Sequence, residues 1–292
     1  MNRNEFQEIL KKEVEDKLGA MYEVHITNVL KNNGVHKAAF MISRESSVAM
    51  TMYLEEAWTG YLAGKDISLL ATEMVNAVKE QSISSESVEP IFDFHKIKNQ
   101  IGIKLMNMEK NRDMLERLPY RSWEDLAIVF YINTSDALGV PSTVMISYGL
   151  LGKWGISETE LVNTAFQNAP RNFPYVLIDL NEMVNGMCGN NLAEEGIRNL
   201  YVLSNKDFHF GASVIAYEST LKTVGEKLNM KRFYILPSSI HEVILVSKED
   251  GEVEQLSELV HGVNQEMVSP EEFLSDHVYE VDLEQETVKI AL

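Results

Sequence analysis

The sequence predicts a mixed α/β fold of the α+β class, with an N-terminal helix–hairpin–helix unit and a larger mixed-sheet region after it. Three observations predict this fold. Helical periodicity and strand-like alternation both recur along the 292 residues. Strands occur in runs as well as between helices, which argues against an all-parallel sheet. A polar stretch then separates two different orders of elements, so we expect units over residues 1–88 and 89–292.

The N-terminal unit opens with an amphipathic segment. Its apolar residues recur at helical spacing, and Gly19 stands where a C-terminal cap belongs. Farther on, the pair Asn33 and Gly34 is the strongest short signal for a hairpin turn. The predicted elements are a helix over 4–18, strands over 22–27, 38–43 and 47–54, a helix over 66–80 and a linker over 81–90.

The C-terminal region alternates strands and helices less regularly. Ser157, with Glu160 three residues later, marks the start of one helix as a capping box. The stretch over 175–184 fits either a strand or a helix. Strands are expected over 100–108, 123–132, 142–150, 198–205, 232–237, 241–247, 277–283 and 287–292, helices over 109–118, 157–169, 218–229 and 252–267, and a turn over 187–191.

One order of elements occurs twice in this region, over 101–170 and over 199–267. Each stretch runs strand, helix, Leu-Pro, apolar strand, helix, and Leu118 and Leu236 begin the two Leu-Pro pairs. An internal duplication predicts this order. Coincidence predicts it equally well, because strand–helix–strand order is common.

Charge and composition limit the classes of partner. The chain has 26 basic and 44 acidic residues, a formal charge of −18. Such a surface repels phosphate backbones, so we expect no direct nucleic-acid binding. The single cysteine forms no internal disulfide, the charged opening is not a signal peptide, and no stretch reaches the roughly 20 apolar residues that span a bilayer. We expect an acidic cytoplasmic protein without membrane contact. The oligomeric state stays open.

Several long stretches resemble a known family. "YVLSNKDFHFGASVIAY", "FYILPSSIHEVILV" and "SPEEFLSDHVYEVD" are similar to a family of uncharacterised bacterial proteins, a domain of unknown function that is frequent in gut-dwelling anaerobes. "IKLMNMEKNRDMLERLPYRSWEDLAIVFYI" resembles the central block of the same family. The resemblance covers most of the chain and implies no reaction, ligand or catalytic residue. The positions that carry it are Asn205, Gly211, 236–239, His241, Glu242, Ser275 and Asp276.

The best candidate for a functional site is "LPSSIHEVILV", residues 236–246. In an extended chain Ser239 and His241 share one face, and nucleophilic catalysis needs such a pair in hydrogen-bond contact. Asp276 is then the residue that would orient the histidine. The alternative is structural, and we favour it: a turn over 237–239 leads into a buried strand.

A metal site would need residues that the sequence does not bring together. His241 and His277 with a carboxylate from Glu242 or Asp276 would suit zinc or iron. His241 and Glu242 point to opposite faces of an extended strand, so we expect neither a metal nor another cofactor. The residues predicted to bind a partner are Asn205, Gly211, Ser238, Glu242 and His277.

The sequence contains none of the common nucleotide-binding, metalloprotease or serine-hydrolase motifs. We therefore interpret the protein first as a non-enzymatic binding protein with a protein partner. A hydrolase that uses His241 with Ser239 or Asp276 is one alternative. An acidic decoy that imitates DNA, or acts against phage defence, is another. The acids are spread through amphipathic helices as solvated faces, which favours binding over mimicry.

Overall fold

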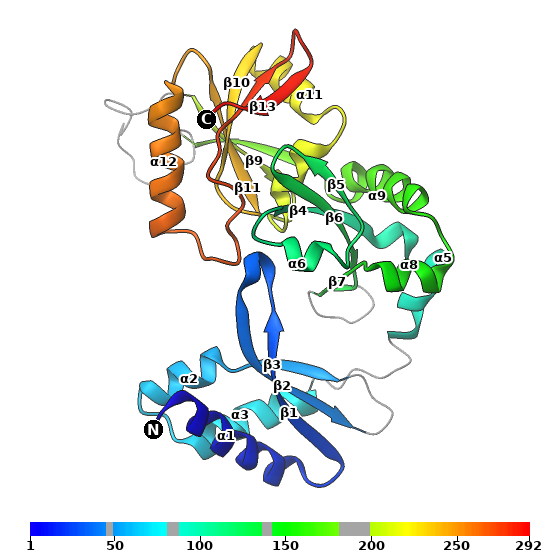
Figure 1. The fold of residues 1–292 in the computed structure, drawn as a ribbon, viewed down its shortest axis with the longest axis vertical. Helices are drawn as coiled ribbons and strands as arrows, with labels where there is room; N and C mark the ends of the chain where they lie inside the picture. The colour runs from blue at the N-terminus through cyan, green and yellow to red at the C-terminus, as the bar shows by residue number, and fades with distance from the viewer. Residues whose placement is uncertain (45–48, 81–87, 136–141, 181–198) are drawn as a thin grey trace. The chain divides into compact units, whose positions relative to one another are not determined.

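The structure, a computed structural model, confirms the α+β class. It divides into two compact units, Met1–Asp93 and Phe94–Thr134 with Ser142–Leu292 (Figure 1). Every strand pair in the described part of the chain is antiparallel. Most of the predicted linker and the predicted turn at 187–191 lie outside the described residues. The structure describes residues 1–44, 49–80, 88–135, 142–180 and 199–292.

The first unit places helices on a three-stranded sheet of order β1-β2-β3. At its start, Asn2 and Glu5 exchange side-chain-to-backbone hydrogen bonds in a capping box. Gly19 ends the first helix at φ +80°, and Asn33 and Gly34 both take positive φ in the predicted hairpin turn. The elements are α1 (Arg3–Leu18), β1 (Tyr22–Leu30), η1 (Asn32–Gly34), β2 (His36–Arg44), β3 (Met50–Tyr53), α2 (Glu55–Leu62), α3 (Ile67–Glu80) and η2 (Glu89–Phe92).

Helix α2 is an element that the sequence analysis did not predict. It is only eight residues long, so its periodicity is weak. Its place in the fold comes from two aromatic side chains, Trp58 and Tyr61, whose ring centroids lie 5.2 and 5.0 Å from that of Phe6. Aromatic pairs at such separations add to the stability that burial provides.

The second unit contains two sheets whose strands are antiparallel in every described pair, where we expected a mixed-sheet region. Several of its strands follow one another through tight turns, and such turns produce antiparallel neighbours. The first sheet has the order β4-β6-β5, and β7 also pairs with β6. Its elements are α5 (Phe94–Ile97), η3 (Lys98–Gln100), β4 (Ile101–Asn107), α6 (Arg112–Leu115), β5 (Tyr120–Trp123), β6 (Leu126–Asn133), β7 (Thr143–Met145), α8 (Tyr148–Trp154) and α9 (Glu158–Asn172).

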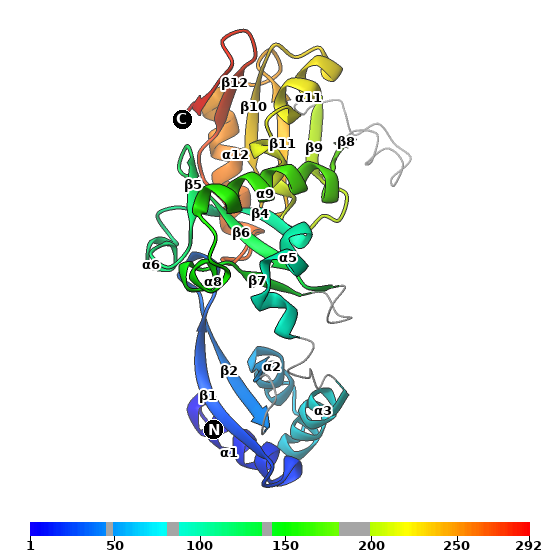
Figure 2. The same cartoon turned by 90° about the vertical axis from the view of Figure 1, so that its right-hand side faces the viewer.

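The second sheet has six strands in the order β13-β12-β10-β11-β9-β8. Helix α12 lies against it (Figure 2), and Leu256 and Val260 of this helix pack on Leu236 and Val246. The elements are β8 (Tyr175–Asp179), β9 (Leu200–Asn205), η4 (Gly211–Ala216), α11 (Thr220–Leu228), β10 (Arg232–Pro237), β11 (Glu242–Ser247), α12 (Val253–Glu266), β12 (Tyr279–Asp282) and β13 (Thr287–Ile290).

The stretch over 236–246 forms the hairpin of β10 and β11. A turn between adjacent strands is confirmed, but it covers 238–241, because Pro237 belongs to β10 and pairs with Val243. The predicted strand over 123–132 is wrong in one respect. It contains a turn at Glu124, which takes φ +50°, and this turn separates β5 from β6. The turn has no glycine, proline or asparagine to reveal it in the sequence.

The two sheets of the second unit share one strand order. Strands β4, β5 and β6 pair in the order β4-β6-β5, and strands β9, β10 and β11 pair in the order β9-β11-β10. Asn107 ends β4, and Asn205 ends β9. The Leu-Pro pairs do not correspond, because Leu118 precedes β5 whereas Leu236 lies inside β10. The two asparagines and the two hairpin turns, β5–β6 and β10–β11, therefore occupy equivalent places in the two sheets.

Candidate functional site

The predicted serine and histidine lie in the β10–β11 turn and bond to other partners. Ser239 Oγ donates to Glu242 Oε1 at 2.8 Å, and Ser238 Oγ donates to the same oxygen at 3.2 Å. Ser239 Oγ accepts from the backbone N–H of His241 at 3.0 Å, while His241 Nδ1 accepts from the backbone N–H of Phe210 at 3.3 Å. The serine proton therefore points to a carboxylate, and the imidazole is not placed to remove it.

The loop after β9 faces this turn and is organised by Asn205. Asn205 Oδ1 accepts from the backbone N–H groups of Asp207 and His209 at 3.1 and 3.3 Å. Its amide donates to the His209 carbonyl at 2.8 Å. Phe208 and Phe210 take φ of +50° and +54°, a conformation that is uncommon for aromatic residues. The contacts of Asn205 hold the loop in shape, and its predicted binding role stays a prediction.

Gly211 lies where three segments meet. Ser204 Oγ of β9 donates to the carbonyl of His241 at 2.7 Å, directly beside Gly211. The predicted importance of Gly211 thus has a structural cause, close approach of neighbouring backbone, which favours glycine.

A cavity of about 440 Å³ lies beside the β10–β11 turn. His241 Nε2 faces Glu272 Oε1 across 3.8 Å. The ring centroids of His209 and His241 are 5.6 Å apart, and Lys104 Nζ lies 4.4 Å from the ring centroid of Phe210. The lining residues are Phe208, Ser238, Ser239, His241, Glu242, Val263, Met267, Val268 and Glu272.

The environment of His209, in the loop after β9, leads to a prediction about how the melting temperature depends on pH. Desolvation lowers the pKa of His209 from its ordinary 6.5, and the charges of His241 and Lys104 lower it further, against an opposing effect of Asp207. The unfolded chain then gains the proton at a higher pH than the folded chain. We expect the melting temperature to fall as pH decreases through about 6.5 and expect His209→Gln to reduce that fall.

Thermal melts between about pH 7.5 and 5.5, above the ordinary range of carboxyl groups, measure this effect. His25→Gln is the matched control, because the His25 side chain is 60% exposed in the first unit. An unchanged pH dependence in His209→Gln would contradict the prediction.

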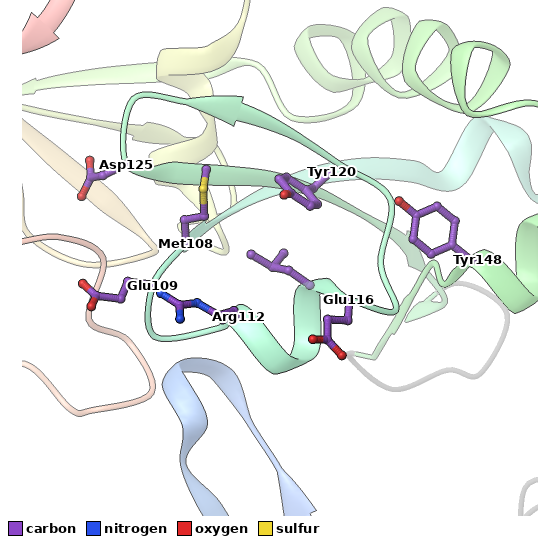
Figure 3. A pocket seen from close by; sticks show the side chains of 8 residues that line it. Met108, Glu109, Arg112, Glu116, Tyr120, Asp125 and Tyr148 are labelled. Atoms are coloured by element: carbon purple, nitrogen blue, oxygen red, sulfur yellow. The ribbon is translucent and has the colours of Figure 1, made fainter.

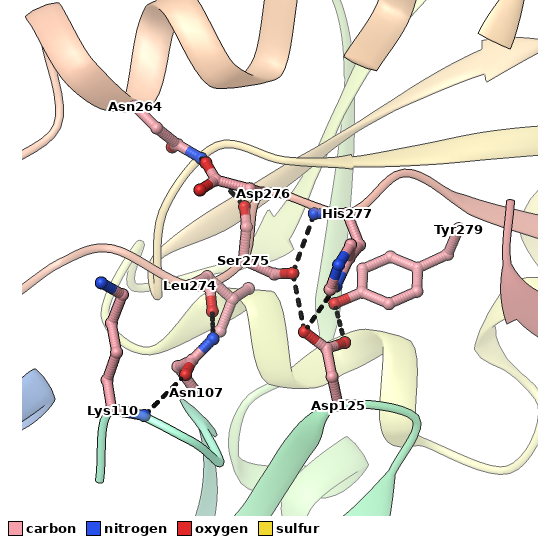
Figure 4. A network of polar contacts seen from close by, with 9 residues as sticks. All are labelled: Asn107, Lys110, Asp125, Asn264, Leu274, Ser275, Asp276, His277 and Tyr279. Atoms are coloured by element: carbon pink, nitrogen blue, oxygen red, sulfur yellow. Dashed lines mark hydrogen bonds and ion pairs between the residues drawn. The ribbon is translucent and has the colours of Figure 1, made fainter. Parts of the chain in front are cut away.

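A second group of predicted residues converges on Asp125, in the turn between β5 and β6 (Figure 4). Tyr279 donates its hydroxyl to Asp125 Oδ1 at 2.6 Å, and Ser275 Oγ donates to Oδ2 at 2.8 Å. His277 Nδ1 lies 3.1 Å from Oδ2. A carboxylate group only accepts hydrogen bonds, so the His277 tautomer that bonds to Asp125 is the one with its proton on Nδ1. Burial, and then the charge of Asp125, raise the pKa of Tyr279 far above its ordinary value, which keeps the phenol a donor.

Asp276 does not take part in this cluster or orient His241. Its Oδ1 accepts from Asn264 Nδ2 at 2.8 Å and lies 3.7 Å from His261 Nδ1, both on α12. Alternation along the segment thus sends Ser275 and His277 toward Asp125 and sends Asp276 toward α12. Neither histidine pairs with its neighbour in the sequence: His277 lies against Asp125, and His241 lies against Glu272.

Asp125 also lines a larger cavity, of about 610 Å³ (Figure 3). No residue of 236–246 belongs to the lining, so the two predicted stretches do not share this cavity. Sequence analysis did not single out Asp125 as a site residue. The available signal was its place directly before β6, the strand that corresponds to β11, which Glu242 begins. The lining residues are Met108, Glu109, Arg112, Leu115, Glu116, Tyr120, Asp125 and Tyr148.

The segment 267–278, which we call the strap, connects α12 to β12 and contacts both turns. Its Glu272 carbonyl accepts from the backbone N–H of Ile240 at 2.8 Å. Its Leu274 carbonyl accepts from Asn107 Nδ2 at 3.1 Å. Leu274 and Ser275 are each only 1% exposed although neither belongs to a helix or strand. The strap is therefore buried at Leu274 and Ser275, whereas Met267, where it begins, is 79% exposed.

These features define an α+β protein with two antiparallel sheets of repeated strand order in one unit, each with a cavity beside its hairpin turn. The chain belongs to a family of unknown function, DUF5688, whose model matches residues 3–282. This confirms the predicted resemblance to a family of unknown function over most of the chain. No curated protein and no solved structure matches the chain. Within the described ranges, no helix has the length and apolar character needed to cross a membrane.

Proposed function

We propose that this is a non-enzymatic binding protein whose 610 Å³ cavity holds a partner's polypeptide segment that combines basic and apolar side chains. The composition of the cavity lining carries the proposal. Met108 and Leu115 form apolar walls together with the rings of Tyr120 and Tyr148. The volume lies within the roughly 300–1,000 Å³ that is usual for ligand pockets.

The charges of the cavity favour a cationic partner. Three carboxylates, from Glu109, Glu116 and Asp125, face a single guanidinium, that of Arg112, which leaves an excess of two negative charges. The formal charge of −18 attracts the same class of partner over a longer range. The tyrosine faces add a surface on which an ammonium or guanidinium group binds favourably. The same charges disfavour nucleic acid.

The state of Asp125 supports binding over catalysis. Its carboxylate already accepts hydrogen bonds from Tyr279, Ser275 and His277, so it is not free to act as a base. It contributes negative charge to the cavity and holds the cluster together. Glu109 and Glu116 are exposed and are left for direct contact with the partner. We propose a protein partner in the cytoplasm, in keeping with the single cysteine of the chain.

A fluorescence-anisotropy titration tests this proposal with a labelled decapeptide of alternating leucine and lysine. We expect saturable binding, and we expect the double substitution Glu109→Gln/Glu116→Gln to weaken it about threefold to tenfold, because exposed ion pairs contribute about 0.2–1 kcal/mol each. The matched control, Glu8→Gln/Glu226→Gln, removes the same charge from exposed helix positions outside the cavity. Equal weakening by both pairs, or equal binding of a leucine–glutamate peptide, would overturn the proposal.

A further inference from the structure

We infer that the second unit has a second binding site, the 440 Å³ cavity at the β10–β11 turn, and that it takes an ammonium or guanidinium group carried on an apolar chain. The existence of the site rests on its own geometry. Only the likeness of its ligand to that of the larger cavity rests on the proposed function.

Three equivalent elements of the repeated strand order contribute to the lining of both cavities. The loop after the first strand contributes Glu109 to one cavity and Phe208 to the other. The turn before the third strand contributes Asp125 to one, and Ser238, Ser239 and His241 to the other. A helix after the third strand contributes Tyr148 of α8 and Val263 of α12, respectively. Such a correspondence extends the repeated strand order to the cavities themselves.

A buried asparagine shapes the first-strand loop in both places. Asn107 Oδ1 accepts from the backbone N–H of Lys110 at 2.9 Å, as Asn205 Oδ1 accepts from that of Asp207 at 3.1 Å. Asn107 and Asn205 are 8% and 1% exposed. Each amide oxygen thus satisfies backbone donors of a loop that leaves a sheet. The two loops are held open beside their cavities by the same device.

An acid at the start of the third strand accepts hydroxyl groups in both places. Asp125, directly before β6, accepts from Ser275 and Tyr279. Glu242, the first residue of β11, accepts from Ser238 and Ser239. Both serines bond to Oε1 of Glu242, and its Oε2 accepts no hydrogen bond from the described residues. This oxygen is therefore the one left to bind a cation from solution.

The lining of the second cavity determines the class of ligand. Its charged members are Glu242 and Glu272, with His241 between them in the turn, and no lysine or arginine belongs to the described lining. Phe208, Val263, Met267 and Val268 supply apolar surface. A bare metal ion does not suit the site, since no described group of three or more His, Cys, Asp or Glu residues could hold one. An organic cation with an aliphatic chain satisfies both the carboxylates and the apolar wall.

Two methionines allow the two cavities to be observed separately. Met267 lines the second cavity and Met108 lines the first. In protein labelled at the methionine methyl groups with carbon-13, n-hexylamine is titrated at neutral pH, where it is an ammonium ion. We expect a saturable shift of the Met267 methyl signal, assigned with Met267→Leu, and no comparable shift with n-hexanol.

Glu242→Gln retains an oxygen for the two serine hydroxyls and removes the charge, so we expect it to weaken the Met267 response at least fivefold and leave the Met108 response unchanged. Glu258→Gln, exposed on α12 and outside the cavity, is the control. A Met267 signal that does not shift, or shifts equally with n-hexanol, overturns this inference. If the Met267 methyl signal shifts and the Met108 signal does not, the result contradicts the proposed function and leaves this inference intact.

Discussion

Gly211→Ala is expected to destabilise the second unit by about 3 kcal/mol, at the upper end of the usual cost of overpacking. An added Cβ would lie 2.7 Å from the backbone nitrogen of Asn205, and closer still to Ser204 Oγ and the carbonyl oxygen of His241. Two of these three atoms belong to the backbone. They cannot move away without disturbing β9 and the β10–β11 turn, so the clash cannot be relieved by a side-chain rotation.

Urea unfolding followed by circular dichroism measures this effect. Gly152→Ala is the control, because Gly152 lies in α8 and an added Cβ there meets no atom within 4 Å. Alanine is favoured over glycine in helices by about 0.8–1.0 kcal/mol, so this variant should be slightly stabilised. If Gly211→Ala unfolds at the same urea concentration as the wild type, the close approach described for this site is wrong.

Asp125→Ala is expected to cost about 3 kcal/mol, because hydrogen bonds to charged groups contribute about 1.5–3 kcal/mol and unsatisfied buried donors add a further cost. The substitution removes the acceptor of Tyr279, Ser275 and His277 together. Tyr279 is fully buried, so its hydroxyl cannot turn to water. The loss should also loosen the strap, because Ser275 is one of its anchors.

The neighbouring acid provides the comparison. Asp276→Ala removes a side chain that is 45% exposed, and we expect it to cost less than about 1 kcal/mol, as is usual for exposed polar contacts. A double-mutant cycle of Asp125→Ala with Tyr279→Phe then measures the coupling of the two side chains. Additive effects in that cycle, or equal losses for Asp125→Ala and Asp276→Ala, would show that Asp125 is not the centre of the cluster.

Most of the fold could be predicted because most elements have a local cause. Gly19, Asn33 and Gly34 act through backbone conformation, and the apolar residues of α1 act through periodicity. The missed features have causes elsewhere in the chain. Helix α2 depends on packing against Phe6, and the turn at Glu124 depends on the pairing of β5 with β6.

The candidate sites also divide into features with a local cause and features whose cause lies elsewhere in the chain. The turn after Pro237 was predicted from local turn rules, and the bonds of its serines to Glu242 join residues three or four positions apart. Asp125 is 150 positions from Ser275 and 152 from His277. No spacing rule connects residues so distant. Sequence analysis therefore selected two donors of this cluster, Ser275 and His277, without Tyr279 and without their acceptor.

One segment, the strap, contacts residues of both cavities. Glu272 lines the smaller cavity, and three residues farther along Ser275 is bonded to Asp125 in the larger one. A ligand whose affinity depends on the position of the strap at one turn therefore also changes the free energy of the strap's position at the other turn. Linkage requires this coupling free energy to be the same in both directions. For such ligands we expect that binding in one cavity changes the affinity of the other cavity.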